Sequence, residues 1–216
     1  GHPSRISACD IDGRHVKWVD EHLPHVDVGQ TSVHPPLPYR DNEFDAIVSI
    51  SVFTHLAEKS QDEFLAELHR ISSRAGYLFL TVHGARALER ALKEPRIRDM
   101  IAVDEALFQE ACRAFAEGRH AFILQQGHLT TSSRSPSRRF LSRMSGQSVV
   151  DEPFEYGITF IPETYLRHHW GRWFDVVAYR AGAIHSFQDM VVLTPRKGGD
   201  DREGKCPIHG GCDLVF

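Results

Sequence analysis

Two histidines stand where an imidazole could act on a bound molecule. His55 lies in the loop that follows the apolar run at residues 44–50, and His83 directly follows the apolar run at residues 77–82. A neutral imidazole at about pH 7 can take a proton from a hydroxyl or amine group. We therefore predict His55 as the catalytic general base, beside the simpler interpretation that it only satisfies backbone groups at a helix entrance. We expect His83 to face the same crevice, with the same two interpretations.

Three other groups of reactive side chains are weaker candidates. His168 and His169 are neighbours in a predicted helix; their side chains point about 100° apart and cannot jointly grip one ion, so we interpret them as a surface pair. Residues 206–212 offer three potential zinc ligands, Cys206, His209 and Cys212, with no fourth nearby. The arginines of residues 130–148 could meet an anionic acceptor, but an exposed basic loop explains them equally well. We therefore predict no metal site.

The elements that must position these residues form a strand–helix–strand unit. Residues 44–50 are a short apolar run with β-branched side chains, which is typical of a central parallel strand buried on both faces. Ser60 and Glu63 can form a capping box at the start of a helix, and Gly76 can reverse the chain at its end. The apolar face of this helix carries Phe64, Leu65, Leu68 and Ile71. Residues 77–82 resume as a second buried strand, for which parallel pairing is the default.

Further elements are predicted on both sides of this unit. Asp12 can cap a helix over residues 13–23, with Val16, Val19 and Leu23 as its buried stripe, and residues 26–31 form a short strand. The later elements are helices over residues 85–93 and 104–117, a strand over 154–161, a helix from Pro162 to about Trp170, and strands over 174–179 and 188–193. Residues 130–148 are predicted to be mobile, and residues 197–216 to be a disordered tail.

Length and composition limit the class of protein. The 216 residues, 41% of them hydrophobic, suffice for one domain with a core. A formal net charge of −4 argues against a general nucleic-acid binder, and no apolar run approaches the ~18 residues of a membrane span. The four cysteines lack a framework spacing, which predicts a reducing, cytoplasmic compartment. We predict neither nucleic acid nor membrane as a partner; the sequence specifies no oligomeric state.

The order of the elements is similar to a known catalytic core. The letters ISVFTHL at residues 50–56 and AELHRISSRAGYLFLTVHG at residues 66–84 resemble the second half of the class I S-adenosylmethionine-dependent methyltransferase fold. SACDID at residues 7–12 resembles the second strand of that family, and the last two predicted strands resemble its closing antiparallel hairpin. The resemblance covers about residues 6–82 and 156–194. It implies a Rossmann-like α/β sheet, mostly parallel with an antiparallel closing hairpin.

The resemblance also implies S-adenosyl-L-methionine as cofactor and a set of residues that bind it. Asp10 matches the acid that binds the cofactor ribose, with Ile11 beside it; the alternative is that Asp10, like Asp12, merely caps the next helix. The position of the adenine-binding acid is taken by Thr31 and Ser32. The residues at the methionine end would be Ser49, Ile50 and Ser51. The methyl acceptor implied is an unidentified small molecule or glycan.

Part of the family pattern is missing from the sequence. No G-x-G turn appears near the start, and residue 1 is not Met. We expect a truncated protein that lacks the first strand and its Gly-rich turn, encoded upstream as a segment of a few dozen residues. Residues 1–196 would then be a partial methyltransferase domain, with residues 85–155 as a lid or substrate insertion and residues 197–216 as the tail. We expect this chain alone to be inactive and marginally stable.

Two alternatives remain open. A non-catalytic binding or assembly domain of the same fold is favoured by the absent Gly-rich turn and the missing adenine acid. A nicotinamide-dependent reductase of doubly wound topology is disfavoured, because it would also need a Gly-rich turn and would not end in an antiparallel hairpin.

Overall fold

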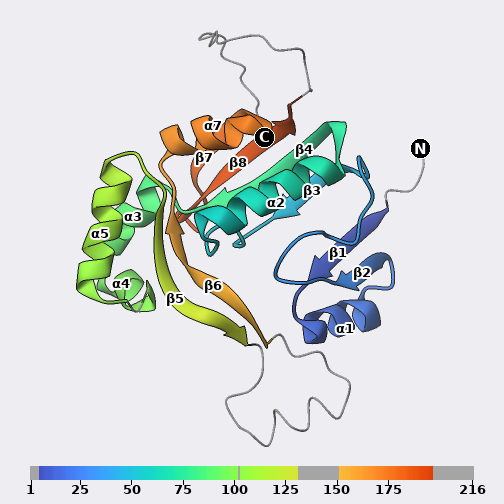
Figure 1. The fold of residues 1–216 in the computed structure, drawn as a ribbon, viewed down its shortest axis with the longest axis horizontal. Helices are drawn as coiled ribbons and strands as arrows, with labels where there is room; N and C mark the ends of the chain where they lie inside the picture. The colour runs from blue at the N-terminus through green and yellow to red at the C-terminus, as the bar shows by residue number, and fades with distance from the viewer. Residues whose placement is uncertain (1–4, 102, 131–150, 197–216) are drawn as a thin grey trace, which may run out of the picture.

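The computed structural model describes residues 5–101, 103–130 and 151–196. The predicted tail and nearly all of the predicted mobile loop lie outside these residues. In chain order, the elements are β1 (Ile6–Asp10), α1 (Gly13–His22), β2 (Val26–Gln30), β3 (Phe44–Ser49), α2 (Glu58–Ile71), β4 (Ser72–Val82), α3 (Ala85–Lys93), α4 (Pro95–Ile101), α5 (Glu105–Ala116), β5 (Ala121–Thr130), β6 (Asp151–Phe160), α7 (Glu163–His169), the 3-10 helix η1 (Trp170–Arg172), β7 (Phe174–Ile184) and β8 (Gln188–Pro195) (Figure 1).

A four-stranded mixed sheet forms the body of the molecule. Its strand order is β3-β4-β8-β7, with β3 and β4 parallel and the other two pairs antiparallel. The parallel β3–α2–β4 unit and the antiparallel closing hairpin β7–β8 were both predicted, and both are confirmed. α2 lies against one face of this sheet (Figure 1), where Leu65, Leu68 and Ile71 pack on buried Leu78 and Leu80.

The start of α2 differs from the prediction. The helix begins at Glu58 after Ala57, which offers no side-chain cap, so the predicted capping box at Ser60 and Glu63 is wrong. Two neighbouring groups explain the earlier start. The buried Gln61 donates from Nε2 to the Phe53 carbonyl at 2.8 Å and ties the preceding loop to the first turn. Ser60 is itself buried inside that turn.

Gly76 also has a different role from the predicted one. It lies within β4 and not at the end of a helix. A Cβ atom at this position would stand 3.0 Å from the Phe44 carbonyl oxygen and 3.2 Å from that of Asp45. The glycine therefore allows β3 to approach β4 closely, where the register of the pair shifts.

β3 is not the central, doubly buried strand that its composition predicts. Among the described residues it lies at the edge of the body sheet, and the side chain of Val48 is 65% exposed. Ala46 pairs with Tyr77 on the neighbouring strand, so Tyr77, 48% exposed, belongs to the same face as Val48. This face, opposite α2, is apolar and exposed, which a strand of such composition would otherwise bury.

The β1–α1–β2 unit forms a second, smaller sheet in which β1 and β2 pair in parallel. Asp12 caps α1 as predicted, accepting a 2.9 Å hydrogen bond from the Arg14 backbone N–H. The predicted buried stripe is only half-buried: within the described part of the chain, no residue of α1 is fully buried. In Figure 1 this unit lies beside the body sheet, and the two sheets share no ladder among the described residues.

The segment between β4 and α7 builds a second apolar core. α3 and α5 lie where the sequence predicts them, and their buried residues Leu88 and Phe108 pack with Ile123 and Phe160. α4 and β5 were not predicted. β5 pairs with β6 in a long antiparallel hairpin (Figure 1), and this pairing, rather than local periodicity, defines β5 as a strand. No helix in the described ranges combines the length and apolar character needed to cross a membrane.

Candidate functional site

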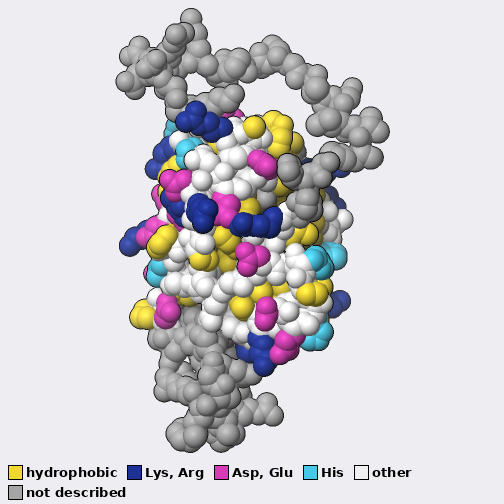
Figure 2. Space-filling view, turned by 90° about the vertical axis from the view of Figure 1, so that its right-hand side faces the viewer, with side chains coloured by type: hydrophobic (Ala, Val, Ile, Leu, Met, Phe, Trp, Pro, Cys, Tyr) yellow, Lys and Arg dark blue, Asp and Glu magenta, His cyan; other side chains and the backbone are white. Residues whose placement is uncertain are grey.

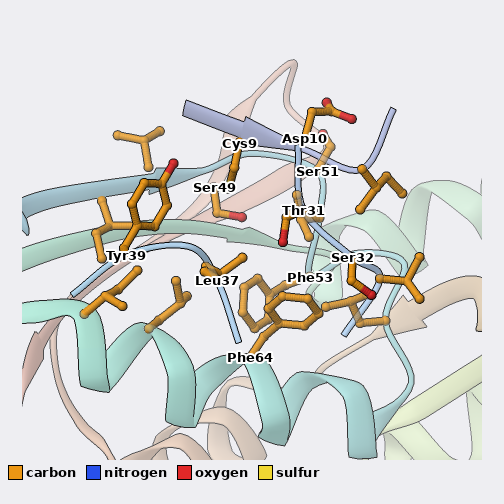
Figure 3. A pocket seen from close by; sticks show the side chains of 18 of the residues that line it. Cys9, Asp10, Thr31, Ser32, Leu37, Tyr39, Ser49, Ser51, Phe53 and Phe64 are labelled. Atoms are coloured by element: carbon orange, nitrogen blue, oxygen red, sulfur yellow. The ribbon is translucent and has the colours of Figure 1, made fainter. Parts of the chain in front are cut away.

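A cavity of about 680 Å³ lies between the two sheets. Its walls come from β1 and β3, the loop after β2, and α2, as Figure 3 shows from close by. Ser7 and Cys9 on β1 and Ala46 and Val48 on β3 all line it. The cavity therefore occupies the space between two strand edges that have no ladder partner among the described residues.

The predicted site residues converge on this cavity, with one exception. Those that line it are Asp10, Ile11, Thr31, Ser32, Ser49, Ser51 and His55. Ile50 does not line it, and its side chain is 49% exposed. The carboxyl ends of β1, β2 and β3 thus meet at one cavity, which is where open α/β sheets bind ligands.

Asp10 lies at the rim of the cavity (Figure 3) with its side chain 43% exposed. Its Oδ1 accepts a 2.7 Å hydrogen bond from the Asp12 backbone N–H, and its Oδ2 lies 3.4 Å from His15 Nδ1. Asp12, and not Asp10, caps α1, and the Arg14 guanidinium holds the pKa of Asp12 below its ordinary value. The Asp10 carboxylate therefore keeps lone pairs for a further donor at the cavity rim.

Two hydroxyl groups of the cavity wall are buried without a partner. Thr31 Oγ1 and Ser7 Oγ have no hydrogen-bond partner in the described part of the chain, although both residues line the cavity. A buried hydroxyl without a partner costs free energy, so such groups mark places where another polar group is expected. A ligand with hydroxyl and amino groups fits this wall better than a purely apolar one.

Ser51 is held in an unusual conformation at the end of β3. Its φ of 60° lies in the left-handed region, and its backbone N–H donates to Thr81 Oγ1 at 2.8 Å. Its side-chain oxygen lies 2.8 Å from Gln188 Nε2 on β8. Body strands β4 and β8 therefore fix the turn that leads from β3 into the His55 loop.

The His55 ring is oriented by strand β6. Its Nδ1 lies 2.8 Å from the Gly157 carbonyl oxygen, which can only accept, so Nδ1 carries the hydrogen and Nε2 keeps its lone pair. The ring stacks on Tyr156, with 4.8 Å between centroids and 10° between planes. Burial lowers the pKa of His55 below its ordinary value, and the Gly157 contact offsets part of this. His55 is thus a neutral imidazole with a free acceptor nitrogen.

His83 does not share the cavity, contrary to the prediction. It is 4% exposed and packs against Phe160 and Phe187. Burial, and then the nearby His55, lower its pKa to about 4. The apolar surroundings that β6 and the β7–β8 turn supply make His83 a buried neutral side chain and not a second base.

Of the remaining candidates, His168 and His169 lie in the described part of the chain. His168 is exposed, while His169 lies 2.7 Å from Asp62 Oδ1, between α7 and the start of α2. No group of three or more potential ligands that could hold a metal ion occurs within residues 5–101, 103–130 and 151–196. Residues 206–212 and the arginines of the 130–148 loop lie outside the described residues. Cys9 and Cys112 are free thiols.

The contribution of β6 to the site was not predicted from the sequence. Phe154 and Tyr156 line the cavity, and Gly157 holds His55. A strand was predicted here, but nothing in its local pattern indicates which loop it contacts. An aromatic residue followed by a glycine in that strand is the one signal that could have suggested a closely packed site.

Comparison with known proteins gives one family match. Residues 1–80 match a family model described as a methyltransferase domain. This segment runs from β1 through α2 into β4 and contains all eight predicted site residues. No protein of curated function matches the chain in sequence.

Two solved structures show the fold. One, of a protein from Methanosarcina mazei named as an S-adenosylmethionine-dependent methyltransferase, superimposes with a TM-score of 0.54 at 11% identity, covering 88% of this chain and 81% of that one. The PH0226 protein from Pyrococcus horikoshii OT3 superimposes with a TM-score of 0.50 at 12% identity, covering 89% of this chain and 72% of that one. Residues 1–80 are therefore similar to methyltransferase domains, and the chain shares its fold with the protein from Methanosarcina mazei.

Proposed function

We propose that the protein transfers a methyl group from S-adenosylmethionine to a hydroxyl or amine group of a small-molecule or glycan acceptor. The observation that carries the proposal is the cavity that gathers Asp10, Thr31, Ser49, Ser51 and His55 at the carboxyl ends of three strands. The matched family segment covers all of these residues.

The cavity wall fits the cofactor that the fold family uses. The Asp10 carboxylate has free lone pairs at the rim and would accept hydrogen bonds from the ribose hydroxyls. The unpartnered Thr31 hydroxyl, with Ser32 beside it, would contact the adenine ring. Ile11 adds an apolar wall, and Ser49 and Ser51 are left for the methionine end. When bound, the cofactor would supply an electrophilic methyl group.

The chain's own chemical contribution is small, because methyl transfer needs mainly orientation and the removal of one proton. His55 Nε2 has a free lone pair, since Nδ1–H is committed to Gly157. It would accept the proton of the acceptor hydroxyl or amine. The lowered pKa of His55 keeps this nitrogen unprotonated at neutral pH.

We also propose that a strand from outside the described residues fills the space between β1 and β3. Each of these strands presents one edge without a ladder partner in the described ranges, and Cys9 and Ala46 line the cavity between those edges. The exposed apolar face around Val48 and Tyr77 supports a missing cover on the same side. The parent gene tests this: an upstream strand with an acidic-x-Gly-x-Gly turn supports the proposal, and its absence contradicts it.

The wider organisation follows from the same proposal. Residues 85–155, from α3 into the first half of β6, would form the lid or substrate insertion of a domain spanning residues 1–196, because β6 reaches the cavity beside His55. On the face in Figure 2, Lys and Arg side chains lie interspersed with Asp and Glu, which supports a small-molecule substrate rather than nucleic acid. A cytoplasmic location remains part of the proposal.

A non-catalytic binding domain is the second candidate. It is favoured by the loop after β2, where Thr31 and Ser32 line the cavity in place of an acid. The two candidates differ in whether the cavity binds the cofactor.

Calorimetric titration of S-adenosylhomocysteine into the full-length protein separates them. We expect a micromolar dissociation constant that Asp10→Asn raises by about tenfold or more, because charge-assisted hydrogen bonds contribute about 1.5–3 kcal/mol. Asp20→Asn, on the exposed side of α1, is the matched control and should leave affinity unchanged. Absence of binding would favour the non-catalytic domain.

A further inference from the structure

Strand β6 has two bonded edges that serve different parts of the molecule. One edge pairs with β5 in the long hairpin. The other is bonded to the loop that carries His55: Gly157 N–H donates to the His55 carbonyl at 3.2 Å, and Thr159 N–H donates to the Thr54 carbonyl at 2.9 Å. The Thr159 hydroxyl adds a 2.7 Å hydrogen bond to the Leu56 carbonyl. The His55 loop is thus shaped by β6 as if by a neighbouring strand.

Two consecutive β6 residues also contact the His55 ring itself. The Gly157 carbonyl lies 2.8 Å from Nδ1, and the Tyr156 ring covers one face of the imidazole in a parallel stack at 4.8 Å. The other titratable ring nearby is His83, edge-on at 6.3 Å between centroids. Rotation of the imidazole about χ2 would break the hydrogen bond, so this contact selects one ring orientation and one tautomer.

Gly157 is suited to this place because nothing larger fits. A Cβ atom there would stand 2.1 Å from the Ile123 carbonyl oxygen and 2.7 Å from the Phe122 ring, both on β5. Any side chain at this position would push β6 away from β5 and move the carbonyl that holds His55. The residue type thus connects the hairpin pairing with the geometry of the ring.

We propose that Tyr156 and Gly157 are positioning residues, which hold His55 as the Nδ1–H tautomer and so present Nε2 as the proton acceptor. This rests on the proposed function in one respect, that His55 is the base. In physical terms, the Gly157 carbonyl selects the tautomer, and the Tyr156 ring limits the tilt of the imidazole and excludes water from one of its faces. The hairpin β5–β6 would therefore set the state of the base from outside the matched family segment.

The tautomer can be measured directly by ¹⁵N–¹H correlation NMR of the imidazole nitrogens in the full-length protein, with the His55 signals assigned through His55→Gln. At a pH where His55 is neutral, we expect a protonated Nδ1 and a bare Nε2. The ratio of tautomers should be at least about fivefold, which one net hydrogen bond supports. A predominant Nε2–H tautomer in the unmodified protein would overturn the proposal.

Two pairs of variants test the named residues. Tyr156→Phe keeps the stacked ring and should keep the tautomer ratio, whereas Tyr156→Ala should lower it at least about twofold. Gly157→Ala should lower it to near unity, and Gly127→Ala, with open space around the new Cβ, is its control. An unchanged ratio in both Tyr156→Ala and Gly157→Ala would overturn the proposal; should Gly157→Ala not fold, Tyr156→Ala decides alone. Titration with S-adenosylhomocysteine measures cofactor binding and does not depend on the His55 tautomer. Absence of binding would therefore contradict the proposed function without deciding the tautomer.

Discussion

The β1–α1–β2 unit and the β3–α2–β4 unit share one pattern of strand, helix and strand, yet they are packed very differently. α2 buries Leu65, Leu68 and Ile71 against a four-stranded sheet, while α1 buries no side chain fully among the described residues. An amphipathic helix is stabilised only as far as a sheet offers a face to cover, and two strands offer little. The same local pattern therefore gives a rigid body in one place and a marginal unit in the other.

The candidate cofactor cavity lies where these two regions meet. Asp10 and Thr31 come from the weakly packed unit, and Ser49, Ser51 and His55 from the body and the loop that β6 holds. The two halves of the site should therefore differ in local stability. The half that would bind the nucleoside opens more easily than the half that would carry the base.

The largest difference in stability between the two units should appear when one apolar side chain is truncated in α2 and one in α1. Leu65→Ala removes a side chain that is 0% exposed and should lower the free energy of unfolding by about 2–5 kcal/mol. Val19→Ala in α1, where the side chain is half-buried, should cost about 1 kcal/mol or less. Urea denaturation followed by circular dichroism measures both. Equal losses would show that α1 is packed as well as α2.

Acidification should affect the two regions in different pH windows. In the folded body the pKa of His83 is lowered to about 4, from an ordinary value of 6.5. The unfolded chain therefore takes up the proton first, and stability is lost as the pH falls from about 6.5 to about 4, by roughly 3 kcal/mol for this residue. The pKa of Asp12 is also lowered from its ordinary value of 3.8. The stability that Asp12 contributes to the β1–α1–β2 unit is therefore fully present above pH 3.8 and is lost only as the pH falls below that value.

Unfolding free energies measured between pH 7 and pH 4 check this prediction. The His83→Phe protein should lose roughly 3 kcal/mol less over that range than the unmodified protein. His168→Gln, which changes an exposed histidine, should follow the unmodified protein. Parallel curves for all three proteins would mean that His83 does not govern the acid sensitivity of the body.

A smaller effect is expected from the close packing at the start of α3. A Cβ atom at Gly84 would stand 1.9 Å from Asp189 Oδ2, which accepts from the Tyr179 hydroxyl. Gly84→Ala should therefore cost about 1–3 kcal/mol, while Gly171→Ala, where a Cβ atom would meet nothing within 4 Å, should stay within about 0.5 kcal/mol. Thermal unfolding compares the two. An unchanged unfolding temperature for Gly84→Ala would show that the packing around Asp189 and Tyr179 adjusts easily to the added methyl group.

The fold was predictable where local patterns coincide with tertiary contacts. Short-range spacing in the sequence predicts the apolar face of α2, the cap at Asp12 and the closing hairpin, and the structure confirms all three. The capping box predicted at Ser60 was wrong, because Gln61 and neighbouring groups determine where α2 begins. β5 was missed because its partner strand begins only at Asp151, so no short-range pattern marks the pair.

The site was predictable for a similar reason, and only in part. Residues at strand ends, such as Asp10 and Ser51, converge because parallel strands end at one edge of a sheet. The environment of a histidine does not follow from its place after a strand. His55 and His83 have similar positions in the sequence, but one lines the cavity and the other is buried between Phe160 and Phe187.

We propose that the weakly packed β1–α1–β2 unit forms the nucleoside-binding half of a methyltransferase site. Hydrogen exchange of the full-length protein, with and without S-adenosylhomocysteine, tests it most directly. At about 100 times the dissociation constant, the amides of β1 and β2 should exchange about a hundredfold more slowly, and Asp10→Asn should reduce this protection. Unchanged exchange in β1 and β2, or equal protection in the Asp10→Asn protein, would contradict the claim.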